Sequence, residues 1–198
     1  MPALPPVICL ASASPRRREL LLQLGVPHRT RGADIDETAQ PAEAPRDYVV
    51  RVACAKAGAV RAQLTSLPVI GADTVVVVDG AMFGKPAGRA QGLKMLAALS
   101  GRVHEVLTAV ALADARGTAI AVSASAVTFR KLTALECRDY WDSGEPHDKA
   151  GAYAIQGLAA AFIQSLHGSY SGVMGLPLFE TAALLRAAGV PYGRLQAR

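Results

Sequence analysis

Asp73 and Thr74 interrupt an apolar run that extends from Val69 to Val78. The run contains four consecutive valines and predicts a strand buried on both faces in the middle of a sheet. A carboxylate beside such a strand is costly to desolvate unless it meets a cation, a metal ion or several hydrogen-bond donors. The alternative is a turn aspartate that caps nearby backbone amides, and this stretch alone leaves both interpretations open.

A second chemical feature is a hydroxyl-rich turn between an apolar segment and a helix near the N-terminus. Residues 7–11 predict a short strand, Ser14 is a good N-cap, and Pro15 suits the first helical position. Gly25 suits a left-handed stop, so the helix has about three turns. Free amides and the positive end of the helix dipole meet at such a start, which favours binding of a phosphate group.

Side chains around this turn can add hydrogen-bond donors to a phosphate, namely those of Ser12, Ser14 and the arginines at 16–18. Cations at a helix N-terminus oppose the dipole, so three arginines there are unfavourable unless an anion lies between them and the helix. Arg16 lies nearest the helix start and is the first candidate. The alternative is a solvated basic turn.

Two lysines add positive charge elsewhere in the chain. Lys56 falls within a helix predicted from 45 to about 63 and shares its apolar face with Val49, Val52, Ala53, Ala57 and Val60. A lysine on a buried face either extends to the helix edge or points at an anion, and Arg51 could do the same one turn earlier. Lys85 lies in a loop constrained by Gly84 and Pro86.

Acidic residues gather in the segment 28–45, which is rich in Pro, Asp, Glu and Thr and predicts a loop with at most a short strand. They are Asp34, Asp36 and Glu37. Carboxylates facing a basic cleft would suit Mg²⁺, which binds one or two carboxylates together with substrate phosphate oxygens. The alternative is a solvated acidic surface.

Composition limits the classes of function. The chain has 198 residues, 51% of them hydrophobic, and a net charge of +5. It is long enough for one sizeable α/β domain, or for one domain split into two lobes around a cleft. The small positive excess suits a polyanionic small substrate as well as a nucleic acid. Aromatic residues are only 5%, which disfavours a base-stacking platform, so nucleic acid is not the expected partner.

The cysteines and the apolar segments indicate the compartment. Cys9, Cys54 and Cys137 are odd in number and lie far apart in apolar segments, which is typical of small buried side chains in a reducing environment. We find neither a signal peptide nor an uncharged apolar run long enough to cross a bilayer. The expected location is therefore the cytoplasm, with no membrane partner.

Helical and strand-like segments alternate along the chain and predict a mixed sheet flanked by helices. Strands are expected at 69–78, 103–112, 119–129 and 161–163, the middle two joined as a hairpin. Further helices are expected at 88–99, from the capping box at Thr133 to about Ser143, and from Leu176 to Gly189. Polar loops are expected at 145–157, where substrate selection suits the composition better than core packing, and at 168–172.

The sequence offers little for nucleophilic or zinc chemistry. The histidines are scattered, no serine lies in a nucleophile-elbow pattern, and the P-loop and dinucleotide motifs are absent. What remains is a set of cations and carboxylates at separate strand ends and loops: Arg16, Lys56, Lys85, Asp73 and Glu37. Phosphoryl and nucleotidyl hydrolysis needs such groups, because catalysis there consists mostly of positioning and charge neutralisation around a metal-bound polyphosphate.

The order of these pieces along the chain is specific. The motifs are Ser12-Ala13-Ser14-Pro15-Arg16-Arg17, the segment 48–57 with Lys56, Gly71-Ala72-Asp73-Thr74-Val75, Gly84-Lys85-Pro86, Ser100-Gly101, His104, Thr108, Asp148-Lys149-Ala150-Gly151-Ala152-Tyr153 and Gly175-Leu176-Pro177-Leu178. From about Val7 to about Leu185 the chain strongly resembles the Maf family of nucleoside triphosphate pyrophosphatases, historically linked to septum formation.

The resemblance implies a single Maf-like domain over 1–198 with an α/β fold of the inosine-triphosphatase type. It implies hydrolysis of a nucleoside triphosphate to the monophosphate and pyrophosphate, dependent on a divalent metal, Mg²⁺ or Mn²⁺. The segment Ala154-Ile155-Gln156-Gly157 resembles the branch that acts on dTTP and UTP, with modified pyrimidine nucleotides as further candidates. A homodimer is compatible with the resemblance.

The resemblance also implies roles for individual residues. Asp73 would be the catalytic proton acceptor and Glu37 would help it to hold the metal. Phosphate contacts would come from Arg16, Lys56 and Lys85, next to Ser12 and Ser14. Base selection would involve Arg16, Thr74 and Gln156.

Two other classes of function stay open. The first is a non-catalytic regulator of cell division whose nucleotide-like cleft binds a ligand or a protein. The second is a nucleic-acid binder acting through the arginines at 16–18, which steep salt dependence of duplex binding would reveal.

Overall fold

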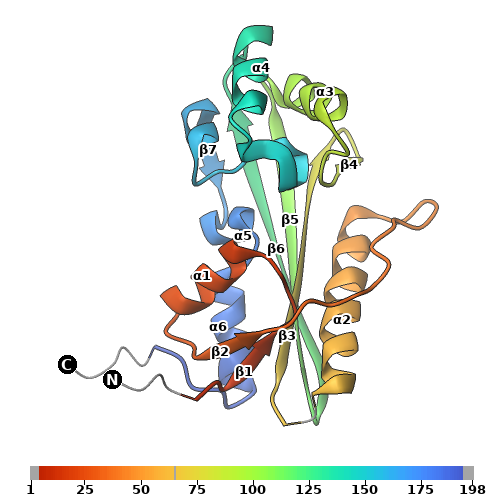
Figure 1. The fold of residues 1–198 in the computed structure, drawn as a ribbon, viewed down its shortest axis with the longest axis vertical. Coiled ribbons are helices and arrows are strands. Elements are labelled where there is room, and N and C mark those ends of the chain that lie inside the picture. Colours follow the sequence, from red (N-terminus) through yellow and green to blue (C-terminus); the bar gives the residue numbers. More distant parts are fainter. Residues whose placement is uncertain (1–4, 65, 194–198) are drawn as a thin grey trace. The chain divides into compact units, whose positions relative to one another are not determined.

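The computed structural model describes residues 5–64 and 66–193 (Figure 1). The chain divides into two compact units. The first consists of Met1–Asp73, Thr108–Ser123 and Gly175–Arg198, and the second of Thr74–Leu107 and Ala124–Met174. The division agrees with the expectation of two lobes, whereas a cleft between them, and one domain covering the whole chain, stay predictions.

Within the described residues seven strands form one mixed sheet, in the order β2-β1-β3-β5-β6-β7 with β4 paired to β3. Their bounds are β1 Ile8–Leu10, β2 His28–Thr30, β3 Val69–Val78, β4 Ala81–Phe83, β5 Val103–Asp114, β6 Gly117–Phe129 and β7 Ile163–His167. β1 is parallel to β2 and β3, while β4 and β7 are antiparallel to their neighbours. The expectation of a mixed α/β fold is confirmed.

The first unit contains helices α1 (Pro15–Gln23), α2 (Pro45–Gln63) and α6 (Leu178–Ala187). Figure 1 shows α2 on one side of β3 and α1 and α6 on the other. α2 packs very closely on the strand: a Cβ placed on Gly71 would lie 2.3 Å from the Ala53 carbonyl oxygen. Only glycine fits there, so β3 and α2 are in fixed register.

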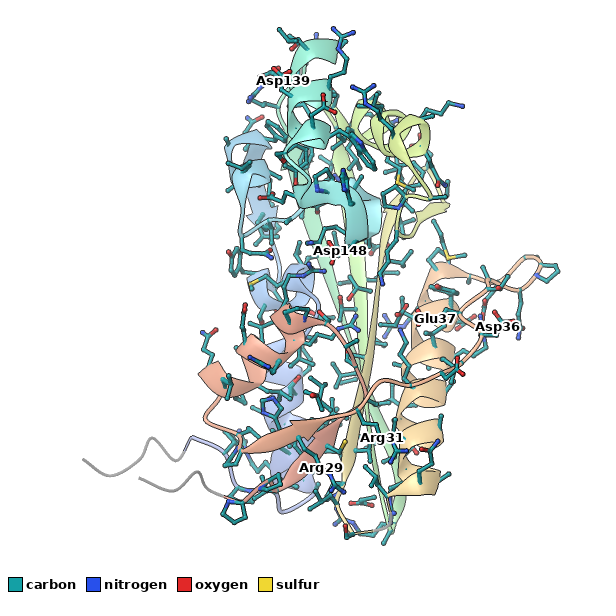
Figure 2. The ribbon with its side chains drawn as sticks, viewed as in Figure 1. Arg29, Arg31, Asp36, Glu37, Asp139 and Asp148 are labelled. Atoms are coloured by element: carbon teal, nitrogen blue, oxygen red, sulfur yellow. The ribbon has the colours of Figure 1, made fainter. Side chains whose placement is uncertain are left out.

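β2 is the edge strand of the sheet in the first unit. It carries Arg29, and Arg31 follows directly after it (Figure 2). Both side chains are exposed. Charges on an edge strand disfavour pairing with a strand of another molecule, which accounts for arginines at this place.

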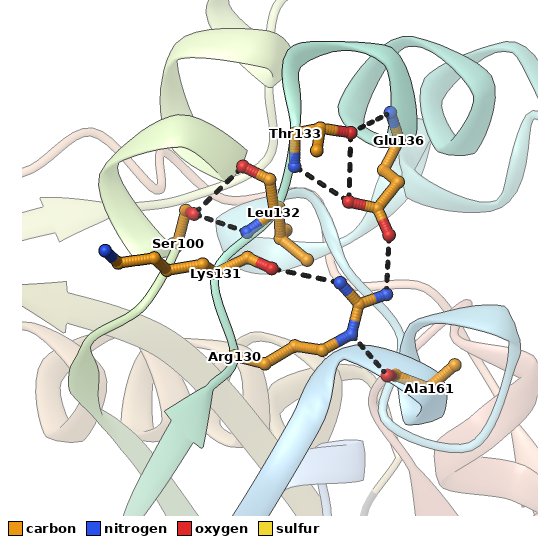
Figure 3. Close-up of polar contacts among 7 residues, drawn as sticks. All are labelled: Ser100, Arg130, Lys131, Leu132, Thr133, Glu136 and Ala161. Atoms are coloured by element: carbon orange, nitrogen blue, oxygen red, sulfur yellow. Dashed lines mark hydrogen bonds and ion pairs between the residues drawn. The ribbon is translucent and has the colours of Figure 1, made fainter.

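The second unit contains α3 (Arg89–Leu99), α4 (Ala134–Asp142), α5 (Tyr170–Met174) and three short 3₁₀ helices, η1 (Glu145–Asp148), η2 (Ala150–Ala152) and η3 (Leu158–Phe162). Its core includes Leu96, Val127, Phe129 and Tyr140. The predicted capping box is confirmed: Thr133 Oγ1 accepts from the Glu136 amide, and Glu136 Oε2 accepts from the Thr133 amide (Figure 3).

Three expectations about this unit were wrong. The strand expected at 161–163 starts later than expected: Ala161 and Phe162 end η3, and β7 starts at Ile163. The polar segment 168–172 begins helix α5, because Ser169 Oγ accepts from the Gly172 amide and caps the turn. The 145–157 segment is partly core: Ala152, Tyr153 and Ile155 are buried in the main apolar cluster. The second depends on a local side-chain bond, and the third on burial between other elements.

Other expectations are confirmed. α2 has the predicted bounds, Gly25 has the left-handed conformation with φ 67°, and Cys9 and Cys137 are buried free thiols. Among the described residues no helix is both long and apolar enough to pass through a membrane.

Candidate functional site

The parallel pairing of β1 with β3 brings the turn at Ser12 to the middle of β3, where Asp73 lies. Leu10 of β1 pairs with Ile70 of β3, and the Ala11 amide donates to the Ile70 carbonyl at 2.7 Å. Ser12 therefore leaves β1 where β3 reaches Asp73. Both side chains are buried.

The structure brings Asp73, Lys56 and Glu37 together in one cluster, as the sequence predicted. Lys56 Nζ lies 2.8 Å from Asp73 Oδ1 and 2.8 Å from Glu37 Oε2. The side chains of Lys56 and Asp73 are each 9% exposed, whereas that of Glu37 is 48% exposed. The lysine on the apolar face of α2 thus points at anions, and the two carboxylates meet at one cationic centre.

The structure separates the roles of Asp36 and Glu37, which adjoin in the sequence. Figure 2 shows Glu37 beside α2 and Asp36 farther out along the loop. Asp36 Oδ1 accepts from the Thr38 amide at 2.8 Å, and bonds with Thr38 lower its pKa. Asp36 therefore stabilises its own turn, while Glu37 faces the cluster.

Contacts with α2 hold the acidic loop in place. Tyr48 Oη donates to the Glu37 carbonyl at 3.1 Å, and Arg51 donates to the Thr38 carbonyl at 3.0 Å. Arg51 also forms a double hydrogen bond with Glu43, which with the Gln40 amide lowers the pKa of Glu43 to about 2. Arg51 thus anchors the acidic loop. These contacts do not support the alternative that Arg51 points at a bound anion.

The turn before α1 differs in detail from the prediction. Ser14 occupies the N-cap position, but its side chain makes no capping hydrogen bond. Instead its amide donates to Ser12 Oγ at 3.1 Å. The turn is therefore organised by Ser12, and the expected capping role of the Ser14 hydroxyl was wrong.

Arg17 also contributes charge to this site, whereas the sequence favoured its neighbour Arg16. Its Nε donates to the Gly175 carbonyl at 2.7 Å. Burial lowers its pKa, and the negative charges of Asp73 and Glu37 act in the opposite direction. Arg17 is therefore within electrostatic reach of both carboxylates. The run of arginines at 16–18 indicates that one of them faces the site, but the rotation of helix α1 decides which one does.

The remaining predicted residues lie in the second unit. Thr74 follows Asp73 in β3 and is half-buried, Lys85 is exposed after β4, and Gln156 is exposed in a turn before η3. The Gly84 carbonyl next to Lys85 accepts from the Gly151 amide at 3.1 Å. The meeting of Lys85 and Gln156 with the Asp73 cluster stays a prediction.

The donor set of the cluster is compatible with a divalent metal. Among residues 5–64 and 66–193 no group of three or more His, Cys, Asp or Glu side chains has the geometry of a metal site. Asp73 and Glu37 nevertheless offer two carboxylates that share one cation, and each has a second oxygen. That number suits Mg²⁺, which completes its shell with water and substrate phosphate oxygens.

Comparisons with known proteins show which family the chain resembles. A dTTP/UTP pyrophosphatase of Bordetella parapertussis is 55% identical, with 94% of each chain covered. Proteins with the same name from Alkalilimnicola ehrlichii and Burkholderia pseudomallei are each 53% identical, covering 96% and 94% of this chain.

One solved structure shares the fold at low identity. The Staphylococcus aureus Ham1 protein superposes with a TM-score of 0.52 at 14% identity, covering 91% of this chain and 98% of that one. The family model described as Maf-like protein matches residues 7–188, which include every residue of the cluster. The chain belongs to the Maf-like protein family.

Proposed function

We propose that this protein hydrolyses nucleoside triphosphates, dTTP and UTP above all, to the nucleoside monophosphate and pyrophosphate. The observation that carries the proposal is the buried contact of Asp73 with Lys56, with Glu37 on the same ammonium. The relatives named dTTP/UTP pyrophosphatase support the choice of substrate, since they match almost the whole chain at more than half identity.

Asp73 is the proposed proton acceptor for the attacking water. A carboxylate within a buried strand has a fixed position, and a fixed base can orient a water toward a bound phosphorus atom. Lys56 offsets the electrostatic repulsion between the Asp73 and Glu37 carboxylates and adds positive charge next to the reacting phosphate. As the water attacks, negative charge grows on the phosphate oxygens, and nearby cations stabilise it.

Phosphate groups are proposed to bind at the start of α1 and at Lys85. The hydroxyls of Ser12 and Ser14 and the guanidinium of Arg16 supply donors there, at the positive end of the helix dipole. Arg17 adds positive charge near Asp73 and Glu37. Base selection is assigned to Arg16, Thr74 and Gln156, because these positions match those that the resemblance associates with it.

Glu37 and Asp73 are the proposed holders of Mg²⁺ or Mn²⁺. When bound, the metal supplies Lewis-acid neutralisation of the phosphate charge. Cytoplasmic location and a homodimer complete the proposal. Three unpaired cysteines support the first, and sedimentation equilibrium tests the second.

The test is to incubate the purified protein with a panel of nucleoside triphosphates and Mg²⁺ or Mn²⁺ and to measure pyrophosphate. We expect release from dTTP and UTP. D73N should lower kcat about 10²–10⁴-fold with unchanged circular dichroism, since it removes the base. D36N is the matched control, because an asparagine still caps the Asp36 turn. An active D73N enzyme would refute the catalytic role, and binding without pyrophosphate release would point to the regulator instead.

A further inference from the structure

The turn that carries Gln156 is held in place on both sides. Gln156 is exposed, whereas Ala154 and Ile155 before it are buried. The Gly157 amide donates to the Ala154 carbonyl at 3.1 Å, which closes the turn. An exposed amide side chain therefore stands on a backbone that is fixed by its neighbours.

Tyr140 of α4 fixes the start of this turn. Its hydroxyl accepts from the Ala154 amide at 3.1 Å and donates to Glu145 Oε1 at 2.8 Å. The ring is buried and packs edge-on against Phe162 at a centroid distance of 5.1 Å. One hydroxyl thus connects the turn to the carboxylate of Glu145.

Glu145 fixes the end of the turn. Its Oε2 accepts from the Leu158 amide at 2.9 Å, and its Oε1 accepts from the Ala159 amide at 3.3 Å. These are first-turn amides of η3, which have no partner inside their own helix. The carboxylate therefore receives three donors: two backbone amides and the Tyr140 hydroxyl.

Gly157 leaves the space that this carboxylate occupies. A Cβ at Gly157 would lie 2.1 Å from Glu145 Oε2. The φ of Gly157 is −113°, a value that other residues adopt readily, so glycine is required for room and not for conformation. The absence of a side chain at Gly157 therefore makes room for the Glu145 carboxylate next to the turn.

We propose that Glu145 and Tyr140 are positioning residues for base selection: they hold the turn 154–157 so that Gln156 meets the pyrimidine edge in one geometry. This inference rests on the proposed function. A glutamine amide carries a donor and an acceptor, and so do the N3–H and O4 of uracil and thymine. Cytosine offers the reverse pattern. A fixed backbone sets the distance and direction from which the Gln156 amide reaches the base, so its contact with dTTP and UTP is complete only while the turn is held in place.

The experiment compares E145Q and Y140F with the wild type. A glutamine at 145 has one acceptor oxygen in place of two, so at least one of the three donors loses its bond. Phenylalanine at 140 keeps the ring packing and removes the hydroxyl that connects the Ala154 amide to Glu145. E136Q is the matched control, because Glu136 in α4 is another hydrogen-bonded glutamate of this unit, and its bonds go to Thr133 and Arg130. Q156A is the reference for loss of selection.

Two readouts are measured for each variant. The first is the ratio of kcat/KM for dTTP to that for dCTP, which we expect to fall on the order of tenfold in E145Q, Y140F and Q156A, with the loss mainly in KM for dTTP. The second is hydrogen exchange, in which the Leu158 and Ala159 amides should exchange faster in E145Q than in the wild type and E136Q. If E145Q does not fold, Y140F provides the same test through the Ala154 amide.

The outcomes separate this inference from the proposed function. An active wild type with unchanged selectivity in both variants overturns the positioning role and leaves the function standing. Unchanged amide exchange in E145Q also overturns it, because the contacts then do not hold the turn. A wild type that releases no pyrophosphate removes the proposed function, and base selection falls with it. Reduced selectivity in both variants but not in E136Q supports the inference.

Discussion

A single ammonium group, that of Lys56, joins carboxylates from a loop and from a central strand. Bringing a lysine and an aspartate out of water is costly, and their mutual attraction repays the cost only with good geometry. The 2.8 Å contact of Nζ with Asp73 Oδ1 meets that condition. Glu37 is half exposed and adds less. The pair is therefore better explained by a function in charge neutralisation than by a gain in stability.

Removal of the Lys56 charge tests this balance. K56M should destabilise the protein by about 3–5 kcal/mol, because it leaves the buried Asp73 carboxylate without its cation. Urea unfolding measures the change, and K94M, at an exposed lysine of α3, is the control that should leave stability nearly unchanged. Equal stability of K56M and wild type would show that the pair is not coupled in the folded protein.

His104 predicts a dependence of stability on pH. The ring is 3% exposed, shares a hydrogen bond of 2.8 Å with Tyr153 Oη and packs against Phe129. Burial lowers its pKa from 6.5 to about 4. The unfolded chain therefore binds a proton first as the pH falls, so stability decreases from about pH 6.5 downward and reaches a loss of about 3 kcal/mol near pH 4.

The measurement is urea unfolding of the wild type and H104F between pH 7 and pH 4. The variant retains a ring among Phe129 and Tyr153 and lacks the titrating group, so its stability should fall less steeply over this range. H167N, at an exposed histidine, should follow the wild-type slope. Parallel curves for H104F and wild type would contradict the assignment.

At the scale of elements, the contact of α2 with β3 places Lys56 next to Asp73. A Cβ at Gly71 would lie 2.3 Å from the Ala53 carbonyl oxygen and 2.6 Å from the Ala57 amide nitrogen. Both atoms belong to the backbone of α2 within one turn of Lys56, so they cannot rotate away. The helix itself must move if the strand carries a side chain there.

G71A should therefore cost about 1–3 kcal/mol of stability and also lower activity, because the displaced helix carries Lys56 away from Asp73. G58A is a matched control in the same helix, where an added Cβ meets open space. It should stabilise the protein by about 0.5–1 kcal/mol through helix propensity. Thermal unfolding and pyrophosphate release measure both effects, and a fully active G71A would show that this close contact does not position the lysine.

At the scale of the whole molecule, the excess of positive charge concerns the encounter with the substrate. The net charge is +5, and a nucleoside triphosphate is strongly negative. Long-range attraction between opposite charges is screened by salt. Its effect appears in the association step and not in the chemical step.

Raising the salt concentration from about 0.05 M to about 0.3 M should therefore lower kcat/KM for dTTP severalfold. The value of kcat at saturating substrate serves as the internal control and should change little. If kcat falls and KM stays constant, the charges act on the bound state and the steering argument fails.

Local patterns in the sequence predicted several features correctly. The bounds of α2 and the burial of Lys56 follow from helical periodicity, because the face that a residue shares depends only on its spacing. The capping box at Thr133 and the stop at Gly25 are likewise short-range. The start of α5 at Tyr170 was missed, because composition favours a flexible turn and the Ser169 cap overrides it.

The mixed α/β class, the helix that bears Lys56, the strand that bears Asp73 and the family can all be predicted from the sequence alone. These rest on periodicity, on turn residues and on the order of motifs, all of which are written along the chain. Packing between elements brings Lys56 into contact with both Asp73 and Glu37, brings Arg17 within electrostatic reach of these carboxylates, and places Glu145 against the turn of Gln156. Those partners lie far apart along the chain or are separated by turns, and their distances follow from packing between elements, which no local pattern encodes.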